Sequence, residues 1–323
     1  MRKKTIAIWC PSSPAPILFP TRFQRAVRNI QSNNFKVMLG HSCSKLQRFD
    51  KNYKDSLTAE LYTYLKNPRV DIILFATGGL TTATLLDVLD WDFIKKYPKP
   101  IIGYSDATSF LLAYNAKTGL ECFHGPMLIS EWGECGGLNS YSLEIFNSVI
   151  SNLEVFLTPP RFWTEEFLFW DKEDIRPRIM KKNKGWFWYR NGVAEGKLVG
   201  GNLSTICLMQ GTDFLPSFRN CILFLEEDSC TPDEMYAKLQ SLKLSGVFEE
   251  ISGLVIGKVA NKKVSSSGLS DFNLIYHHIF KDYNFPILTE VDFGHTNPMI
   301  TLPIGRIAVI DSDKKGILIK KNE

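Results

Sequence analysis

The sequence predicts an α/β protein, with an N-terminal α/β domain built on a parallel sheet and a C-terminal β-rich α/β domain. Three observations support this fold class. The first half alternates short apolar runs with longer helical patterns, which is typical of a parallel sheet covered on both faces. A tryptophan-rich stretch without clear periodicity separates the two halves. The chain has 323 residues, a length that suits two domains.

The N-terminal domain, residues 1–157, contains five predicted strands, each a short run rich in apolar and β-branched residues. These strands cover Thr5–Trp9, Lys36–Leu39, Asp71–Ala76, Pro100–Gly103 and Glu121–His124. The helices predicted between and after them are Thr21–Ser32, Lys54–Lys66, Thr81–Leu89, Asp106–Lys117 and Tyr141–Ser151. Ligands of parallel sheets bind beyond the carboxyl ends of the strands, so we expect functional residues in the loops that follow them.

A connecting segment, residues 158–199, leads into the C-terminal domain, residues 200–323. The segment holds four of the seven tryptophans, which are Trp163, Trp170, Trp186 and Trp188. The strands predicted in the C-terminal domain are Cys221–Leu225, Gly253–Lys258, Ile287–Val291 and Arg306–Ile310, and its predicted helices are Leu203–Gln210, Asp233–Leu242 and Ser270–Phe280. The stretch Ile304–Lys320 is predicted to form a hairpin that turns at Asp311–Lys315.

Composition excludes several classes of protein. Hydrophobic residues make up 44% and charged residues 22%, so disorder is not the dominant state. The net charge of +4 is too small to indicate a nucleic-acid partner. The longest apolar runs, such as Ile72–Ala76, have the length of strands and cannot span a membrane. Pro11 interrupts the short apolar stretch near the start, which argues against an export signal. We therefore expect a cytoplasmic protein.

No cofactor or metal is expected from the sequence. None of the seven cysteines forms a CxxC pair, so neither a zinc site nor a disulfide framework is predicted. Gly78-Gly79 follows a predicted strand, and paired glycines let the backbone approach a ligand closely, although a plain turn would also explain them. The dinucleotide-binding and P-loop patterns do not occur, so a nucleotide cofactor has no support.

Ser105 is the candidate nucleophile. It lies in Gly103-Tyr104-Ser105-Asp106-Ala107, where a predicted strand turns into a helix. In a nucleophile elbow this turn exposes the serine hydroxyl above the sheet, and the next amide can face an oxyanion. Ala107 replaces the last glycine of the usual pattern. A serine that only caps a helix is the alternative interpretation.

The candidate base and acid also follow predicted strands. His295 lies in a loop flanked by glycine and proline, next to polar residues. His124 ends another strand, where a structural hydrogen bond would explain it equally well. The run Glu226-Glu227-Asp228 ends an apolar strand and could orient an imidazole, but its spacing does not select one of the three carboxylates. With Ser105, these residues allow a serine–histidine–acid relay.

In these residues the sequence resembles the LD-carboxypeptidase family of serine peptidases, and within it the microcin C self-immunity branch. The matching stretches are Gly78-Gly79, residues 103–106, 124–126, 200–203, 223–226, 294–298 and 302–305. Each is short, but their order and spacing together are specific. The resemblance implies that Ser105 is the nucleophile, Glu226 the orienting acid and His295 the general base. It also implies an oxyanion hole formed by the amides of Gly79 and Asp106.

The resemblance implies further properties. The family is cytoplasmic, needs no metal, commonly forms homodimers and cleaves an amide bond near a free carboxylate of a small peptide or peptide–nucleotide. Gly78, His124 and Asn202 lie in matching stretches and are expected near the substrate. The tryptophan-rich segment resembles the loop that stacks on the nucleobase in the self-immunity branch. Trp186 is the preferred candidate for this stacking because a polar stretch with Gly185 precedes it.

Three functions are compatible with these observations. The first is a serine carboxypeptidase or amidase that acts on microcin C-like peptidyl- or aminoacyl-nucleotides. The second is a murein tetrapeptide LD-carboxypeptidase of cell-wall recycling, and the third is a non-catalytic protein that binds a peptide–nucleotide. The complete set of Ser105, Glu226 and His295 argues against the third. Thr77 stands where murein-cleaving relatives often carry another residue, which leaves the substrate open.

Overall fold

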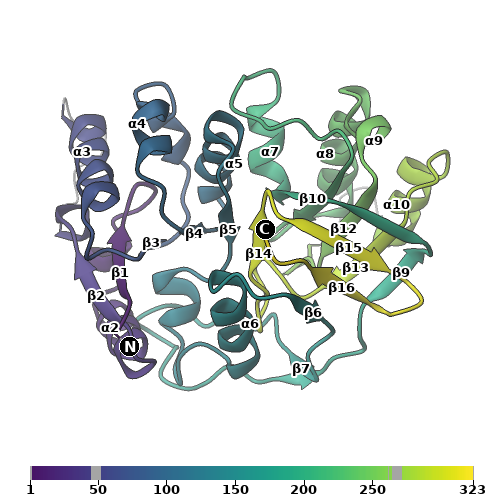
Figure 1. The fold of residues 1–323 in the computed structure, drawn as a ribbon. Coiled ribbons are helices and arrows are strands. Elements are labelled where there is room, and N and C mark those ends of the chain that lie inside the picture. Colours follow the sequence, from purple (N-terminus) through teal and green to yellow (C-terminus); the bar gives the residue numbers. More distant parts are fainter. Residues whose placement is uncertain (1, 45–51, 261, 264–270, 323) are drawn as a thin grey trace.

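Two sheets, flanked by helices, form the framework of the computed structural model, which describes residues 2–44, 52–260, 262–263 and 271–322 (Figure 1). The strands are β1 (Thr5–Trp9), β2 (Lys36–Leu39), β3 (Ile72–Phe75), β4 (Ile101–Gly103), β5 (Cys122–His124), β6 (Val155–Leu157), β7 (Phe162–Trp163), β8 (Lys181–Lys182), β9 (Phe187–Arg190), β10 (Val193–Asn202), β11 (Cys221–Glu226), β12 (Gly253–Gly257), β13 (Ile287–Val291), β14 (Leu302–Ile304), β15 (Ile307–Asp311) and β16 (Gly316–Ile319). The α-helices are α1 (Ala15–Leu18), α2 (Pro20–Ser32), α3 (Tyr53–Lys66), α4 (Trp91–Lys96), α5 (Ala107–Thr118), α6 (Ser140–Ile150), α7 (Leu203–Met209), α8 (Pro232–Leu244), α9 (Val247–Glu250) and α10 (Phe272–Phe280). Two 3₁₀ turns, η1 (His41–Ser44) and η2 (Thr82–Leu85), and a π-helical turn, η3 (Leu128–Trp132), complete the elements.

The first sheet has the order β14-β5-β4-β3-β1-β2. Strands β1 to β5 are parallel to their neighbours, whereas β14 is antiparallel to β5. The order reverses between β1 and β3, and in such sheets the crevice beyond the strand ends at this point is the usual binding site. The predicted parallel sheet is therefore confirmed.

The second sheet has the order β6-β16-β15-β10-β11-β12-β13-β9. Its centre, β10 to β13, is parallel, and antiparallel strands extend it on both sides. The strands predicted at Cys221–Leu225 and Ile287–Val291 are present, and the predicted terminal hairpin is formed by β15 and β16. None of the helices in the described part of the chain has the length and apolar content that a bilayer-spanning helix needs.

Helix α5 connects the two sheets. It begins directly after the loop that carries Ser105 and contacts both β10 and α7, and Figure 1 shows it between the sheets. Helix α5 and strand β10 approach each other closely at Gly201, where a Cβ would lie only 2.6 Å from the side chain of Thr108. The amide of Asn202 donates to Thr108 Oγ1 at 3.0 Å. The loops that follow β4, β10 and β11 are thereby fixed next to one another.

One predicted helix is wrong. Thr81–Leu89 is expected to be helical, but the structure contains only the short turn η2 there. The amides of Thr81 and Thr82 both donate to the buried carboxylate of Asp106, at 3.1 and 3.0 Å. This long-range anchor fixes the direction of the turn, and the sequence pattern alone does not reveal it.

The chain crosses between the two sheets. Strand β6, in residues 1–157, pairs with β16 in the second sheet, and β14, in residues 200–323, completes the first sheet. The segment 158–199 contains β7, β8 and β9 as well as the start of β10. The domain boundaries drawn from the sequence stay a prediction.

Candidate active site

Ser105 occupies a sharp turn between β4 and α5. Its φ of 59° lies in the left-handed region, which is uncommon for a residue with a side chain and is concentrated at functional sites. Its carbonyl oxygen accepts a hydrogen bond of 3.5 Å from Thr205 Oγ1 in the first turn of α7. The backbone therefore has the geometry that the sequence predicts for a nucleophile elbow.

The loop after β3 lies against this turn. A Cβ at Gly78 would lie 2.9 Å from Ser105 Oγ and 3.7 Å from the amide of Asp106, so only glycine leaves this space open to a ligand. A Cβ at Gly79 would instead meet the carbonyl oxygen of Ser12 at 2.8 Å. Asp106 holds the loop in place through its side chain, because its Oδ2 accepts hydrogen bonds from the loop and from Ser12 Oγ at 2.7 Å.

Glu226 and His295 form a hydrogen-bonded pair at the ends of β11 and β13. His295 Nδ1 lies 2.7 Å from Glu226 Oε2, and the Glu226 carboxylate is buried. Gly294 makes this contact possible. Its φ is 88°, and a Cβ there would lie 2.5 Å from Glu226 Oε2. The carboxylate fixes one ring nitrogen and leaves Nε2 available for a substrate or nucleophile.

The neighbouring carboxylate, Glu227, points the other way. Its Oε2 accepts hydrogen bonds from Ser204 Oγ at 2.6 Å and from Lys238 Nζ at 2.8 Å. This arrangement follows from the alternation of side chains along a strand. The structure thus distinguishes between two carboxylates that the sequence spacing leaves equivalent.

The two histidines differ in protonation. Burial opposes protonation of His295, but the charge of Glu226 and its hydrogen bond outweigh this effect and raise the pKa of His295 to about 9. Burial and the nearby His295 lower the pKa of His124 to about 3. His124 is fully buried among aromatic rings, with its ring centre 5.4 Å from that of Phe224.

Ser105 and His295 line one pocket of about 240 Å³. Gly78 also lines it, and further walls come from the loop after β5 and from the tryptophan-rich segment. The remaining lining residues are Arg22, Thr77, Tyr104, Met127, Ser130, Glu131, Glu134, Glu165, Glu166, Phe167, Leu168, Trp170, Arg178 and Asp228. The pocket combines a hydroxyl, an imidazole oriented by a carboxylate, and nearby backbone amides, which together suit acyl transfer.

Three residues predicted near the substrate lie outside this lining. His124 is buried, and the Asn202 side chain caps α7 by accepting from the amide of Thr205 at 3.0 Å. Trp186 lines a different cavity and donates from Nε1 to Asp292 Oδ2 at 2.8 Å. Of the four tryptophans in the segment, Trp170 is the one in the lining.

Other pocket residues were not predicted from the sequence. Glu131 is a buried carboxylate on the π-helical turn η3, and it accepts a hydrogen bond of 2.8 Å from Tyr104. Arg22 and Arg178 lie far apart in the sequence, and both donate to Glu134. In the sequence, the apolar neighbours of Glu131 weakly indicate that it is buried. Nothing in the sequence around Arg22 and Arg178 indicates the pocket, because only the fold brings both of them to Glu134.

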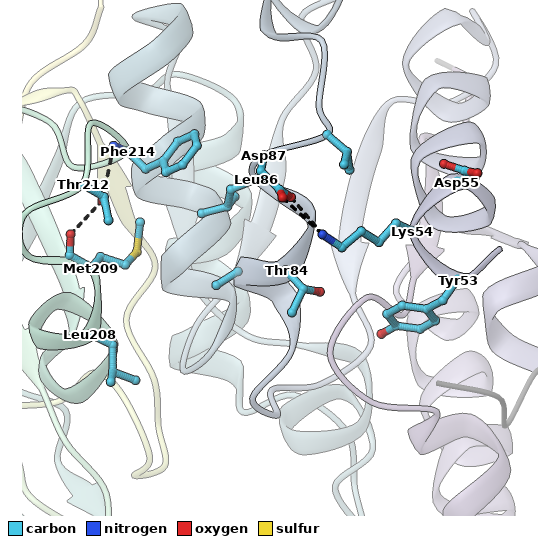
Figure 2. A pocket seen from close by; sticks show the side chains of 12 residues that line it. Tyr53, Lys54, Asp55, Thr84, Leu86, Asp87, Leu208, Met209, Thr212 and Phe214 are labelled. Atoms are coloured by element: carbon cyan, nitrogen blue, oxygen red, sulfur yellow. Dashed lines mark hydrogen bonds and ion pairs between the residues drawn. The ribbon is translucent and has the colours of Figure 1, made fainter. Parts of the chain in front are cut away.

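A larger cavity of about 710 Å³ lies elsewhere, between α3, the turn η2 and α7 (Figure 2). Lys54 Nζ lies 3.0 Å from Asp87 Oδ1 there, as Figure 2 shows. Its lining is mostly apolar and includes Leu208 and Phe214. It contains none of the predicted site residues, so volume alone does not locate the chemistry.

Comparison with known proteins finds a match for each half of the chain. Residues 6–125 match the LD-carboxypeptidase N-terminal domain, and residues 195–310 match the LD-carboxypeptidase C-terminal domain. The microcin C7 self-immunity protein MccF of Escherichia coli is 32% identical over 320 residues, which cover 98% of this chain and 92% of MccF. A probable murein peptide carboxypeptidase of Bacillus subtilis is 26% identical over 324 residues, covering 98% of this chain and 91% of that protein.

Solved structures give the same result. The structure of MccF in complex with aspartyl sulfamoyl adenosine superposes with a TM-score of 0.92 at 31% identity. The match covers 100% of this chain and 97% of that one. A second MccF structure, which contains glutamyl sulfamoyl guanosine, matches with the same score, identity and coverage.

Proposed function

The chain belongs to the LD-carboxypeptidase family and is a serine-type carboxypeptidase, and we propose that it hydrolyses the amide bond joining an aminoacyl or peptidyl group to a nucleotide-like moiety. Ser105 is the nucleophile, His295 the general base and Glu226 the residue that orients His295. The observation that carries this proposal is the 2.7 Å contact between His295 Nδ1 and Glu226 Oε2, beside a serine with left-handed backbone.

The proposed reaction has two acyl-transfer steps. His295 Nε2 takes the proton of Ser105 as its hydroxyl oxygen attacks the scissile carbonyl carbon. The same imidazole then gives this proton to the departing nitrogen, and an ester between Ser105 and the acyl group remains. A water molecule, deprotonated by His295, then attacks the ester carbonyl, and His295 returns this proton to Ser105 Oγ as the free acid is released. Glu226 stabilises the imidazolium in each step.

The negative oxygen of each tetrahedral intermediate needs hydrogen-bond donors. The amides of Gly79 and Asp106 are the proposed pair, and neither has a hydrogen-bond acceptor among the described residues. Removal of one such donor costs about 10²- to 10³-fold in kcat in other enzymes. The contacts of Asp106 with Ser12 and with the turn η2 support this role, because they hold both loops in place before substrate arrives.

The nucleotide part of the proposed substrate rests on two observations. The first is the similarity to MccF, whose structures contain aspartyl sulfamoyl adenosine and glutamyl sulfamoyl guanosine. The second is the half-buried Trp170 in the pocket lining, next to Phe167, which is 53% exposed. An aromatic ring at the rim of the pocket can stack on a base.

A competition assay tests the substrate class. The purified protein is offered aspartyl sulfamoyl adenosine and a murein tetrapeptide, and the products are identified by mass spectrometry. We expect release of aspartate and sulfamoyl adenosine, and no release in Ser105→Ala. Cleavage of the tetrapeptide alone would assign the protein to the murein carboxypeptidases, and cleavage of neither compound would contradict the proposed substrate class.

A further inference from the structure

Glu131 is a buried carboxylate in the wall of the catalytic pocket. It is 5% exposed and lies on the π-helical turn η3, an element that occurs frequently at functional sites. Its oxygens accept three hydrogen bonds, from Tyr104 Oη at 2.8 Å, from the amide of Met127 at 2.9 Å and from Ser130 Oγ at 2.6 Å. All three donors are neutral, so the charge of the carboxylate is not compensated by them.

The other glutamates of this pocket are paired with cations. Glu134 accepts from Arg22 and Arg178, Glu165 from Lys181 at 2.6 Å, and Glu166 from Arg176 at 2.7 Å. Among the described residues, no ion pair includes Glu131. The two arginines of the lining are likewise already bound to carboxylates. In this pocket Glu131 is therefore a buried carboxylate without a direct ion pair, whereas both arginines of the lining are already paired.

We propose that Glu131 binds the α-ammonium group of the substrate's acyl part and thereby favours aminoacyl groups, which carry a free α-amine, over peptidyl groups, in which this nitrogen is acylated. This inference rests on the proposed function and names the chemistry that its acyl site recognises. A buried carboxylate is costly unless it is paired, and a ligand ammonium would supply the missing counter-charge. Burial raises the pKa of Glu131, although its three hydrogen bonds and the charge of Arg178 act in the opposite direction.

The size and position of the pocket favour an α-amine. Its volume of about 240 Å³ is below the roughly 300–1,000 Å³ of pockets that enclose a whole drug-sized ligand, so only one end of an aminoacyl-nucleotide fits. The scissile carbonyl must reach Ser105 inside this pocket. Tyr104, which donates to Glu131, directly precedes Ser105 in the chain. The amine next to the scissile carbonyl therefore lies on the side of the carboxylate.

Two isosteric compounds test the inference. Alanyl sulfamoyl adenosine carries the ammonium, and lactoyl sulfamoyl adenosine carries a hydroxyl in its place. We expect the wild-type protein to favour the alanyl compound by about 10- to 100-fold in kcat/KM, the size of a hydrogen bond between charged groups. Glu131→Gln should reduce this ratio to near one. Glu131→Asp and the control Glu165→Gln, which alters a glutamate paired with Lys181, should keep it.

Tyr104→Phe distinguishes an effect of the Glu131 charge from an effect of Glu131 on the position of Tyr104. It removes one donor to Glu131 and leaves the carboxylate, so the preference for the alanyl compound should persist. Loss of the preference in Tyr104→Phe as in Glu131→Gln would overturn the inference, because Glu131 would then act only by placing Tyr104. A wild-type ratio near one, or an unchanged ratio in Glu131→Gln, would also overturn it. Hydrolysis of neither compound by the wild-type protein would contradict the proposed function and the inference with it.

Discussion

His295 Nδ1 lies 2.7 Å from Glu226 Oε2, and this contact connects the ends of two parallel strands that are not adjacent in the sheet. Strand β12 lies between β11 and β13, so the two side chains meet beyond its end. Gly257, the last residue of β12, leaves this space free, because a Cβ there would lie 3.2 Å from Glu226 Cβ. The pair therefore depends on the absence of a side chain at the last position of the intervening strand.

The pair predicts the pH dependence of the reaction. The pKa of His295 is raised to about 9 by Glu226, and the base must be neutral to accept a proton. We expect kcat/KM to rise with pH until about pH 9. Glu226→Gln removes the charge, so the rise should move to lower pH while kcat falls by about 10⁴-fold, as in other serine triads that lose their acid.

Glu227→Gln is the matched control for this variant. Glu227 binds Ser204 and Lys238 rather than His295, so its loss should leave the pH profile unchanged. Stopped assays across a range of pH with a single substrate measure both effects. A wild-type profile that is already flat above pH 7, or a larger loss in Glu227→Gln than in Glu226→Gln, would refute the assignment.

Backbone strain at Ser105 predicts that substitution by glycine abolishes activity but relieves strain in the fold. Ser105→Ala and Ser105→Gly should both abolish turnover, since neither retains a nucleophile. A left-handed residue with a side chain costs on the order of 1 kcal/mol that glycine avoids. Ser105→Gly should therefore have a higher free energy of unfolding than Ser105→Ala, by up to about 1 kcal/mol, in denaturant titrations. Residual turnover in either variant would contradict the serine mechanism.

Gly294→Ala should disable the enzyme more than it destabilises the fold. The added Cβ would lie 2.5 Å from Glu226 Oε2, so the carboxylate must move away from His295. Gly246→Ala is the control, because Gly246 also has positive φ, at 77°, but no heavy atom near its Cβ position. Gly246→Ala should lose about 1 kcal/mol of stability. Gly294→Ala should lose this and the additional cost of displacing Glu226, and only Gly294→Ala should lose activity. Similar turnover in both variants would show that the glycine is not needed for the pair.

Trp170 and Trp186 should differ in their effect on nucleotide-bearing substrates. If Trp170 stacks on the base, Trp170→Ala should lower kcat/KM for an aminoacyl sulfamoyl adenosine roughly 5- to 150-fold. This corresponds to a loss of about 1–3 kcal/mol of stacking free energy. Trp170→Phe should keep most of this activity because it retains an aromatic face. Trp186→Ala removes the hydrogen bond to Asp292 and should affect substrates with and without a base equally. A base-dependent loss in Trp186→Ala alone would reverse the assignment.

Local patterns in the sequence predict much of the fold. The strands that carry Ser105 and Glu226 are continuous apolar runs, and burial of both sheet faces requires that pattern. The structure contains these strands within one or two residues of the predicted bounds. Ser105 and His295 follow strands, so both could be named as candidates from local patterns, whereas the choice of Glu226 among three carboxylates comes from the family resemblance.

The remaining features depend on contacts between distant parts of the chain. The turn at Thr81 and Thr82 is set by Asp106. Trp170 and Trp186 line different pockets, and the sequence does not reveal which of the two pockets each one lines. That Glu131 takes part in no ion pair among the described residues is visible only when the partners of its neighbours are known. Such properties belong to the assembled pocket, and a single sequence carries no local record of them.

The exchange of strands between the two sheets has a consequence for biosynthesis. Leu302 of β14 pairs with His124 of β5, more than half the chain length earlier. On the ribosome, the edge of β5 stays unpaired until β14 has emerged, and an open edge invites pairing with other chains. The loop with His295 arrives only shortly before β14. The hydrolytic machinery can therefore be assembled only after β14 has been synthesised, and a product truncated before His295 would combine an aggregation-prone sheet with an inactive serine.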